Sequence, residues 1–212
     1  RKPTVIFIMV DDLGWMDLSC QGSRYYETPN LDRLASEGMR FTNAYAACAV
    51  CSPTRAAVQT GRYPARLGVT DWIRSRFPGG AIPSDKINPS GFTGGKRKFL
   101  VPKNALWMES EEVTIAELLK PAGYVTCHIG KWHLGADDWY PQKQGYDFNY
   151  GGCDYGQPPS YFDPFNQPKH RHAMIRAGIP NLPGRKSGQS LSDREAEEAV
   201  AFIEKHKDKP FF

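Results

Sequence analysis

The sequence predicts an α/β protein in which a mostly parallel central sheet is sandwiched by helices. Three observations carry this prediction. The run VIFIMV (5–10) is continuously apolar and β-branched, which is typical of a strand buried on both faces of a parallel sheet. Two stretches, 114–130 and 192–212, each place a helical pattern directly before a strand pattern. A chain of 212 residues is also long enough for one substantial core.

A short amphipathic helix is expected within TPNLDRLASEG (28–38). Thr28 serves as its N-cap, Pro29 occupies the first helical position and Gly38 ends it. The side chains expected to point inward are Leu31, Leu34 and Ala35.

A second helix with the same signals is expected within SPTRAAVQTG (52–61). Ser52 is the expected cap, Pro53 opens the helix and Gly61 closes it. The helix start therefore follows directly on Cys51.

Capping boxes predict where two further helices begin. Thr114 and Glu117 start the helix of TIAELLKPAGY, which leads into the strand YVTCHIG. Ser192 and Glu195 start the helix of SDREAEEAVAFIEKHK, and the KPFF that follows opens another strand. The apolar face of this last helix is formed by Ala196, Ala199, Val200 and Ile203.

Composition excludes several classes of protein. The net charge of +4 is small and scattered, whereas nucleic-acid binding calls for a clustered basic stripe. No run approaches the roughly 18 apolar residues of a membrane span. Five cysteines are an odd, sparse set and not a disulfide framework. The chain starts RKPTVIFIMV without the regions of a signal peptide, so any leader has been removed or never existed.

Two adjacent acids, Asp11 and Asp12, follow the first predicted strand, where α/β sheets collect their ligands. Neighbouring carboxylates share a site only if a cation offsets their repulsion, and hard divalent cations such as Ca²⁺ and Mg²⁺ prefer oxygen ligands. Two Asp cannot complete a shell of about six ligands, so others must contribute. The alternative is a simple turn at a strand end.

Cys51 is expected at a helix N-terminus, where unpaired N–H groups and the helix dipole favour anions. Arg55, four residues later, adds a cationic fork on the same side. The place suits a nucleophile that faces an anionic substrate. A plain thiol would nevertheless be a soft ligand beside hard-cation carboxylates, and the alternative is a small buried cysteine.

The spacing Cys48-x-x-Cys51 allows a redox pair as a competing interpretation. Against it, redox motifs of this kind start their helix at the first cysteine, whereas Pro53 places the helix start after both. A structural zinc site is weaker still, because no second pair of closely spaced Cys or His completes four ligands.

Lys131 and His133 follow the strand YVTCHIG. In an extended chain alternate side chains share a face, so the ammonium and the imidazole can point into one pocket. There they would act as anion clamps, or as a clamp and a proton donor. Ordinary loop residues are the alternative for each.

Taken together, DD after the first strand, CSPTR with TGR, and GKWHLG resemble the formylglycine-dependent type I sulfatases of the alkaline-phosphatase-like fold. The resemblance covers nearly the whole chain, and C-x-P-[ST]-R with TGR is its specific part; Thr54 stands where serine is commoner. TGRYPARLG and the GG-x₃-G-x-PPSYF stretch look most similar to bacterial arylsulfatase A-type enzymes that act on sulfated glycans.

The resemblance implies that a formylglycine-generating or sulfatase-maturating enzyme oxidises Cys51 to formylglycine, an aldehyde that hydrates to a gem-diol. Asp11, Asp12 and the modified Cys51 would then share one calcium. One diol oxygen attacks sulfur, the alcohol departs, and loss of the second hydroxyl's proton re-forms the aldehyde and expels sulfate. Arg55 stabilises the hydrated aldehyde, Lys131 neutralises the sulfate oxygens, and His133 contacts or orients the diol.

The resemblance also implies that residues 1–212 are the N-terminal part of a longer catalytic domain. An Asp-Asn pair of metal ligands, a further histidine and lysine, and a smaller C-terminal domain are expected beyond this chain. A sulfated carbohydrate substrate and secretion or periplasmic export follow from the family. Two alternatives remain open, namely a phosphatase or phosphodiesterase of the same fold and a non-catalytic binder of sulfated glycans.

Overall fold

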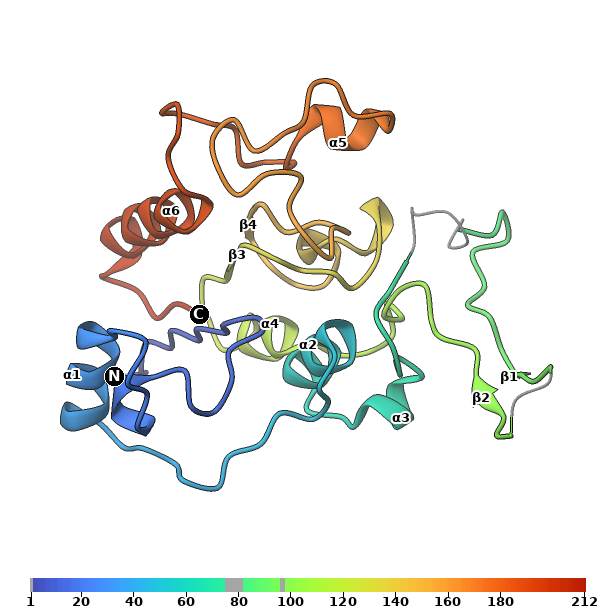
Figure 1. Ribbon diagram of the computed structural model, residues 1–212, viewed down its shortest axis with the longest axis horizontal. Helices are drawn as coiled ribbons and strands as arrows, with labels where there is room; N and C mark the ends of the chain where they lie inside the picture. The colour runs from blue at the N-terminus through green and yellow to red at the C-terminus, as the bar shows by residue number, and fades with distance from the viewer. Residues whose placement is uncertain (1, 75–81, 96–97) are drawn as a thin grey trace. The chain divides into compact units, whose positions relative to one another are not determined.

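The computed structural model describes residues 2–74, 82–95 and 98–212 and divides into two compact units. The large unit comprises Arg1–Ile6 and Ala47–Phe212, and the small unit comprises Phe7–Ala46. Within the described ranges, no helix combines the length and apolar character needed to cross a membrane. The elements in chain order are η1 (Ser19–Gln21), α1 (Pro29–Glu37), α2 (Cys51–Thr60), α3 (Pro64–Leu67), β1 (Phe92–Thr93), β2 (Val101–Pro102), α4 (Ile115–Leu119), β3 (Cys127–Ile129), η2 (Asp137–Trp139), η3 (Pro141–Lys143), β4 (Phe148–Tyr150), α5 (Ala173–Ala177) and α6 (Leu191–His206) (Figure 1).

The large unit contains a parallel pair of strands, β3 and β4, that lie side by side in Figure 1. Their register sets Cys127 opposite Phe148. On the other edge of β3, the Cys127 amide donates to the carbonyl of Phe212 at 2.8 Å, and Val125 forms a parallel bridge with Phe211. The chain at KPFF, where the sequence predicts the opening of a strand, therefore lies beside the strand of YVTCHIG and forms an isolated parallel bridge with it, and the α/β class is confirmed.

The run 5–10 is not a strand in this structure, so the prediction of a doubly buried strand is wrong here. Ile6 and Ile8 are 59% and 73% exposed. A β-branched sequence favours extended backbone, but a strand also needs partners along its edges. Among the amides of residues 5–10, that of Val5 donates a hydrogen bond to another backbone group of the described chain, the carbonyl of Phe211 at 3.0 Å.

Helix α2 begins two residues earlier than expected, at Cys51 and not at Pro53. Val50 is the N-cap, and Gly61 ends the helix in the left-handed region at φ +67°. Pro53 falls in the first turn, where its missing N–H has no helical partner to lose. Ser52 is not the cap, because its hydroxyl is engaged in the tertiary contact described below.

The two predicted capping boxes have different outcomes. Thr114 and Glu117 form one at the start of α4, with reciprocal hydrogen bonds of 2.8 and 3.2 Å. At α6 the cap is Ser190, whose Oγ accepts from the Asp193 amide at 3.1 Å, so a Ser192 cap is wrong. Both serines precede an acid by three residues and satisfy the same rule, but the partner expected for Ser192 turns inward against Gly130 and is not available for capping.

The buried face of α6 carries charge. Arg194, Glu198 and Phe202, spaced by four residues, are buried, and Arg194 Nη1 lies 2.6 Å from Glu198 Oε1. Ala196 and Val200 are exposed, so their assignment to the inward face is wrong. A prediction from hydrophobicity places alanine on the buried face in preference to arginine. An arginine paired with a glutamate four residues later can nevertheless be buried, because the two charges compensate each other.

In the small unit, α1 has the predicted bounds. Leu31 and Leu34, however, are 40% and 61% exposed, which corrects their inward assignment. The helix is held through polar contacts: Asp32 Oδ1 accepts from the Cys20 amide at 2.8 Å and from Thr28 Oγ1 at 3.0 Å. Local polar bonds can therefore fix a short helix while its leucines remain exposed.

The loop that follows β3 is anchored in the core of the large unit. Trp132 and Leu134 are buried in one cluster with Ala56 of α2, and Trp132 Nε1 donates to the carbonyl of Trp139 at 2.8 Å. At Gly135, with φ +135°, an added Cβ would lie 2.7 Å from Trp139 Cβ. The GKWHLG loop is thus rigidly placed, which fixes the backbone of the residues between its glycines.

Candidate active site

Cys51 is the first residue of α2 and is half-buried. The preceding loop folds onto the helix: the Thr54 amide donates to the Val50 carbonyl at 3.3 Å, and Thr54 Oγ1 donates to the Cys48 carbonyl at 2.6 Å. Ser52, Pro53 and Thr54 are buried beneath it. The side chain at position 51 is therefore presented at a fixed helix N-terminus, as the sequence predicts.

Arg55 links α2 to the loop after β3. Its Nη1 donates a hydrogen bond to the backbone carbonyl of Lys131. The side chain is half-buried, so the guanidinium charge is only partly screened by solvent. Two of the predicted site residues, distant in sequence, are thereby brought into direct contact.

A second link between these segments runs through Ser52, which is fully buried. Ser52 Oγ donates to the His133 carbonyl at 2.9 Å and accepts from the Ile73 amide at 3.0 Å. The His133 amide donates to the Cys153 carbonyl at 2.9 Å. The backbone on either side of Trp132 is therefore tied to the first turn of α2.

Ser52→Ala is expected to lower the free energy of unfolding by about 2 kcal/mol, because a buried carbonyl and a buried amide each lose a partner. Urea unfolding followed by tryptophan fluorescence measures this loss. Ser187→Ala, at an exposed position, is the control and should stay within about 0.5 kcal/mol of the parent. Equal unfolding midpoints for the two variants would show that the Ser52 bridge contributes nothing.

His133 differs from the extended conformation expected for it. Its φ is +60°, in the left-handed region, and its ring is 2% exposed with Nε2 3.0 Å from the Ile73 carbonyl. An added Cβ at Gly156 would lie 2.6 Å from His133 Cε1, so only glycine fits against the ring. The alternation argument that placed Lys131 and His133 on one face therefore does not describe this loop.

Asp11 and Asp12 form an exposed turn in the small unit, and Asp12 has φ +57°. Nearby, Asp17 Oδ2 accepts from the Gly14 amide at 2.7 Å and closes the next turn. Because Cys51 belongs to the large unit, the sharing of one metal site by Asp11, Asp12 and residue 51 stays a prediction. In the described ranges, no group of three or more His, Cys, Asp or Glu side chains is placed to hold a metal ion.

A small cavity of about 50 Å³ lies beside Lys131. Burial raises the pKa of the Glu195 carboxyl above its ordinary value, while the charge of Arg55 acts in the opposite direction. The carboxylate packs on Gly130, where an added Cβ would lie 3.1 Å from Glu195 Oε1. The side chains of Glu195 and Lys131 therefore line the same cavity. The cavity is lined by Gly130, Lys131, Gly151, Cys153, Tyr155, Gln157, Pro158, Ile179, Leu191 and Glu195.

Two neighbouring titratable groups in β3, the Cys127 thiol and the His128 imidazole, are uncharged near neutral pH. Burial, reinforced by Glu198, raises the pKa of the Cys127 thiol to about 12, so it stays protonated and unreactive. Burial, followed by the charge of Arg55, lowers the pKa of His128 to about 4, so its ring is neutral.

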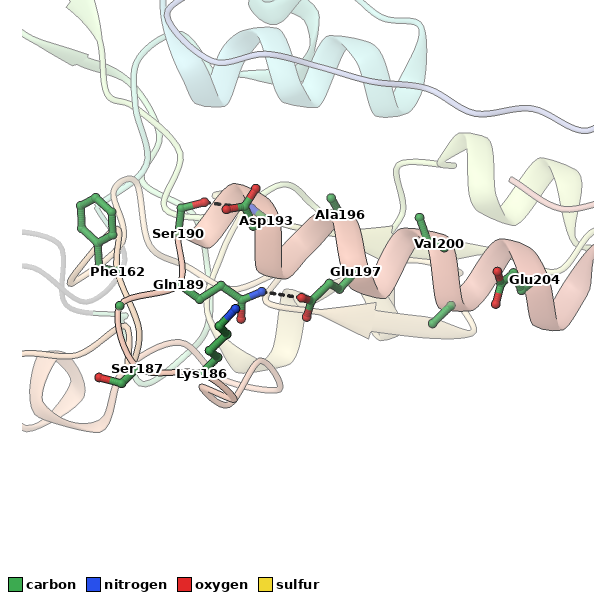
Figure 2. A pocket seen from close by; sticks show the side chains of 12 residues that line it. Phe162, Lys186, Ser187, Gln189, Ser190, Asp193, Ala196, Glu197, Val200 and Glu204 are labelled. Atoms are coloured by element: carbon green, nitrogen blue, oxygen red, sulfur yellow. Dashed lines mark hydrogen bonds between the residues drawn. The ribbon is translucent and has the colours of Figure 1, made fainter. Parts of the chain in front are cut away.

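A larger groove of about 880 Å³ runs along the exposed face of α6 (Figure 2). Asp193, Glu197 and Glu204 line it, and Lys186 is the one basic residue among its lining side chains. Its size favours ligand binding, but three carboxylates against one ammonium disfavour an anionic ligand. The candidate site is therefore the region of Cys51 and Lys131.

Cys48 and Cys51 are both free, half-buried thiols. Cys51 is the first residue of the helix and Cys48 lies in the loop before it. A redox pair of this spacing has its first cysteine at the helix start, so the observed position keeps the redox interpretation disfavoured.

Sequence patterns missed three parts of this site. Ser52 and Glu195 were assigned to helix caps, and Tyr155 was only one of many aromatic residues in its stretch. For Glu195 a signal existed, because helical spacing puts it on the same face as Leu191 and Ala199. For Ser52 and Tyr155 the partners are distant in sequence, and no local pattern points to them.

Comparison with known proteins gives one family. The Sulfatase family model matches residues 3–212. N-acetylgalactosamine-6-sulfatase of Homo sapiens is 36% identical over 219 residues, covering 100% of this chain and 38% of that protein. Arylsulfatase A of Homo sapiens is 40% identical over 149 residues, covering 69% of this chain and 24% of that protein. The chain thus spans well under half the length of these relatives.

Solved structures agree with the sequence relatives. Ps i-CgsB superposes with a TM-score of 0.74 at 30% identity, over 100% of this chain and 44% of that one. BT4656, solved in complex with its substrate D-glucosamine-2-N,6-O-disulfate, gives a TM-score of 0.66 at 28% identity, over 100% of this chain and 33% of that one. With the fold and the family match in agreement, the chain belongs to the sulfatase family of α/β proteins with the alkaline-phosphatase-like fold.

Proposed function

We propose that this chain forms the first part of a sulfatase that hydrolyses sulfate esters on a sulfated carbohydrate. The observation that carries the proposal is the joining of CSPTR to the KWH loop, through Arg55 to the Lys131 carbonyl and through Ser52 to the His133 carbonyl. Support for the substrate class comes from a relative named N-acetylgalactosamine-6-sulfatase and from a neighbour solved with a sulfated glucosamine.

The proposed nucleophile is the side chain at position 51 after oxidation of its thiol to an aldehyde and hydration to a gem-diol. One hydroxyl oxygen bonds to the sulfur of the ester while the bond from sulfur to the sugar oxygen breaks, and the sugar alcohol takes up a proton. The second hydroxyl then gives up its proton, the carbonyl re-forms, and the bond from carbon to the sulfate oxygen breaks. Sulfate leaves, and position 51 is again an aldehyde.

Position 51 suits this chemistry electrostatically. The N-terminus of α2 favours the negative charge that develops on the diol, and Arg55 adds a fixed cation one turn later. The Lys131 ammonium is assigned to the sulfate oxygens. His133, whose Nε2 donates to the Ile73 carbonyl in its neutral form, has its proton-accepting nitrogen at Nδ1, and it is assigned to the diol proton.

Calcium is the metal proposed for the site, held by Asp11, Asp12 and the oxygen of modified Cys51. The donor set fits a hard cation by its chemistry, because two adjacent carboxylates otherwise repel each other and the modification replaces sulfur with oxygen. Further oxygen ligands must come from elsewhere to reach about six. When bound, the ion would offset the carboxylate charges and favour ionisation of the diol.

Mass spectrometry of the peptide that contains Cys51 tests the proposal. In the full-length protein, produced together with a sulfatase-maturating enzyme, the peptide is expected to be lighter by about 18 Da than the cysteine form. The rate of sulfate release from sulfated monosaccharides should rise in proportion to the fraction of protein in which Cys51 is converted. Chelation with EDTA should abolish this activity, and added calcium should restore it. A fully active protein with an intact thiol would contradict the mechanism, and hydrolysis of phosphate esters alone would favour the phosphatase alternative.

Three further proposals concern the whole protein. Residues 1–212 form the N-terminal part of the catalytic domain, and a smaller C-terminal domain follows. A maturating enzyme is the partner that modifies Cys51. The working protein is periplasmic or secreted, in keeping with extracellular sulfated glycans as substrates.

A further inference from the structure

A basic segment outside the sulfatase motifs lies between β4 and α6. Residues 164–190 contain Lys169, Arg171, Arg176, Arg185 and Lys186, two histidines, and no Asp or Glu. The whole chain carries 27 Lys and Arg against 23 Asp and Glu, so its charge is otherwise nearly balanced. Such a local excess produces a positive potential at one place on the surface.

Part of this charge holds the segment together. Arg176 Nη1 donates to the carbonyls of His170 and Arg171 at 2.8 and 2.9 Å, which closes the turn before α5. The Gln167 amide donates to the Ile175 carbonyl at 3.1 Å and braces the other side. We call residues 169–176 the basic strap.

The remaining charge faces solvent. Lys169 and Arg171 are exposed, and Arg171 Nε donates to His172 Nε2 at 3.1 Å. Neither Lys169 nor Arg171 forms an ion pair with an acid in the ranges that the structure describes. By contrast, Arg185 Nη2 lies 2.6 Å from Glu198 Oε1, a carboxylate oxygen that it shares with Arg194. Two uncompensated cations are thus presented on a hydrogen-bonded turn.

The basic strap is fastened to the wall of the cavity beside Lys131. The Tyr155 hydroxyl lies 2.8 Å from the Met174 carbonyl and 3.1 Å from the Gly178 carbonyl, between which it shares its proton. Tyr155 and Ile179 line the same cavity as Lys131. Figure 1 shows α5 in orange, within the stretch of chain that runs from β4 to α6. The backbone at the end of the strap is therefore held by a residue that also lines the cavity beside Lys131.

We propose that the basic strap binds a second sulfate group of a polymeric sulfated glycan, away from the ester being cleaved. This inference rests on the proposed function. A sulfated polysaccharide repeats its anionic groups along the chain, so a cationic turn in the same compact unit as Cys51 and Lys131 can meet another sulfate of the same molecule. The exposed guanidinium of Arg171 suits the planar pairing of oxyanions, and the ammonium of Lys169 adds a point charge.

The test compares two substrates in the full-length, matured enzyme. In the variant with Lys169→Gln and Arg171→Gln, kcat/KM for a sulfated oligosaccharide such as neocarrahexaose should fall about five- to tenfold, the effect of two exposed charge contacts. The fall should lie in KM and shrink as salt is raised. Hydrolysis of 4-nitrophenyl sulfate, which carries one sulfate, should be unchanged.

The control variant, Lys207→Gln with Lys209→Gln, removes the same charge at the same spacing from exposed positions after α6. It should leave both substrates unaffected. An equal loss in the control, or an equal loss on 4-nitrophenyl sulfate, would overturn the role of the basic strap. The role would also be overturned if single-stranded DNA of matched length and charge bound the enzyme as tightly as the sulfated oligosaccharide does.

Failure of the proposed function is recognised separately. If the parent protein releases no sulfate from either substrate, the affinity for the sulfated oligosaccharide, measured by calorimetry, still tests whether the basic strap binds it. Weaker binding by the strap variant than by the control supports the inference, and identical binding refutes it.

Discussion

Cys51→Ala is expected to abolish sulfate-ester hydrolysis, lowering kcat by about 10⁵- to 10⁶-fold, the scale on which removal of a covalent nucleophile acts. Alanine supplies no group that can be oxidised to an aldehyde. The substitution is structurally mild, because Cys51 is half-buried at the first position of α2 and alanine is a good helix former. Sulfate release from a monosaccharide sulfate measures the activity, and circular dichroism establishes that the fold is kept.

Cys51→Ser sharpens this test. A serine side chain that escapes oxidation keeps one hydroxyl, which can attack sulfur, but it lacks the second hydroxyl that expels sulfate. The protein is then expected to accumulate a sulfate ester at position 51, heavier by about 80 Da, after a single turnover. Multiple turnovers by Cys51→Ala would contradict any nucleophilic role for this residue.

Local signals in the sequence predicted local structure well. Helix α1 begins at Pro29 and α2 ends at Gly61 because these residues have intrinsic backbone preferences that no distant contact has to supply. The capping box of Thr114 and Glu117 is satisfied within four residues. The motif that indicates the family, C-x-P-[ST]-R, is equally local.

Properties that depend on distant partners were not predictable in this way. Whether 5–10 forms a strand is decided by its edges, and whether Leu31 is buried is decided by what packs on α1. Ser52 satisfied the rule for a cap, yet its hydroxyl bonds to the His133 carbonyl, 81 residues away. The left-handed backbone of His133 likewise occurs together with a distant contact, the packing of its ring on Gly156.

The same distinction applies to the candidate site. Sequence spacing could place Cys51 and Arg55 on one helix and Lys131 in the following loop. It could not show that the Lys131 carbonyl accepts a hydrogen bond from Arg55, or that Glu195 faces that loop. Contacts of this kind determine how firmly the cationic groups are held, and hence the size of the effects expected on mutation.

Arg55→Ala is expected to lower kcat/KM by about 10²- to 10³-fold, the loss typical of one preorganised charge that stabilises a transition state. Two effects combine in this variant. The charge beside residue 51 disappears, and the Lys131 carbonyl loses its donor, so the loop that carries the sulfate clamp is loosened. Arg66→Ala, at an exposed position in α3, is the control and should retain the parent's activity.

Arg55→Lys separates the two effects, because an ammonium keeps the charge but loses the fork that reaches the Lys131 carbonyl. If charge dominates, this variant should recover most of the activity that Arg55→Ala loses; if positioning dominates, it should resemble Arg55→Ala. A readout besides activity is available in His128, whose pKa of about 4 is set first by burial and then by the charge of Arg55. That pKa, followed by NMR, should rise in Arg55→Ala and stay low in Arg55→Lys. An unchanged His128 pKa together with full activity in Arg55→Ala would place the guanidinium outside the site, and the link between α2 and the GKWHLG loop would then have no part in catalysis.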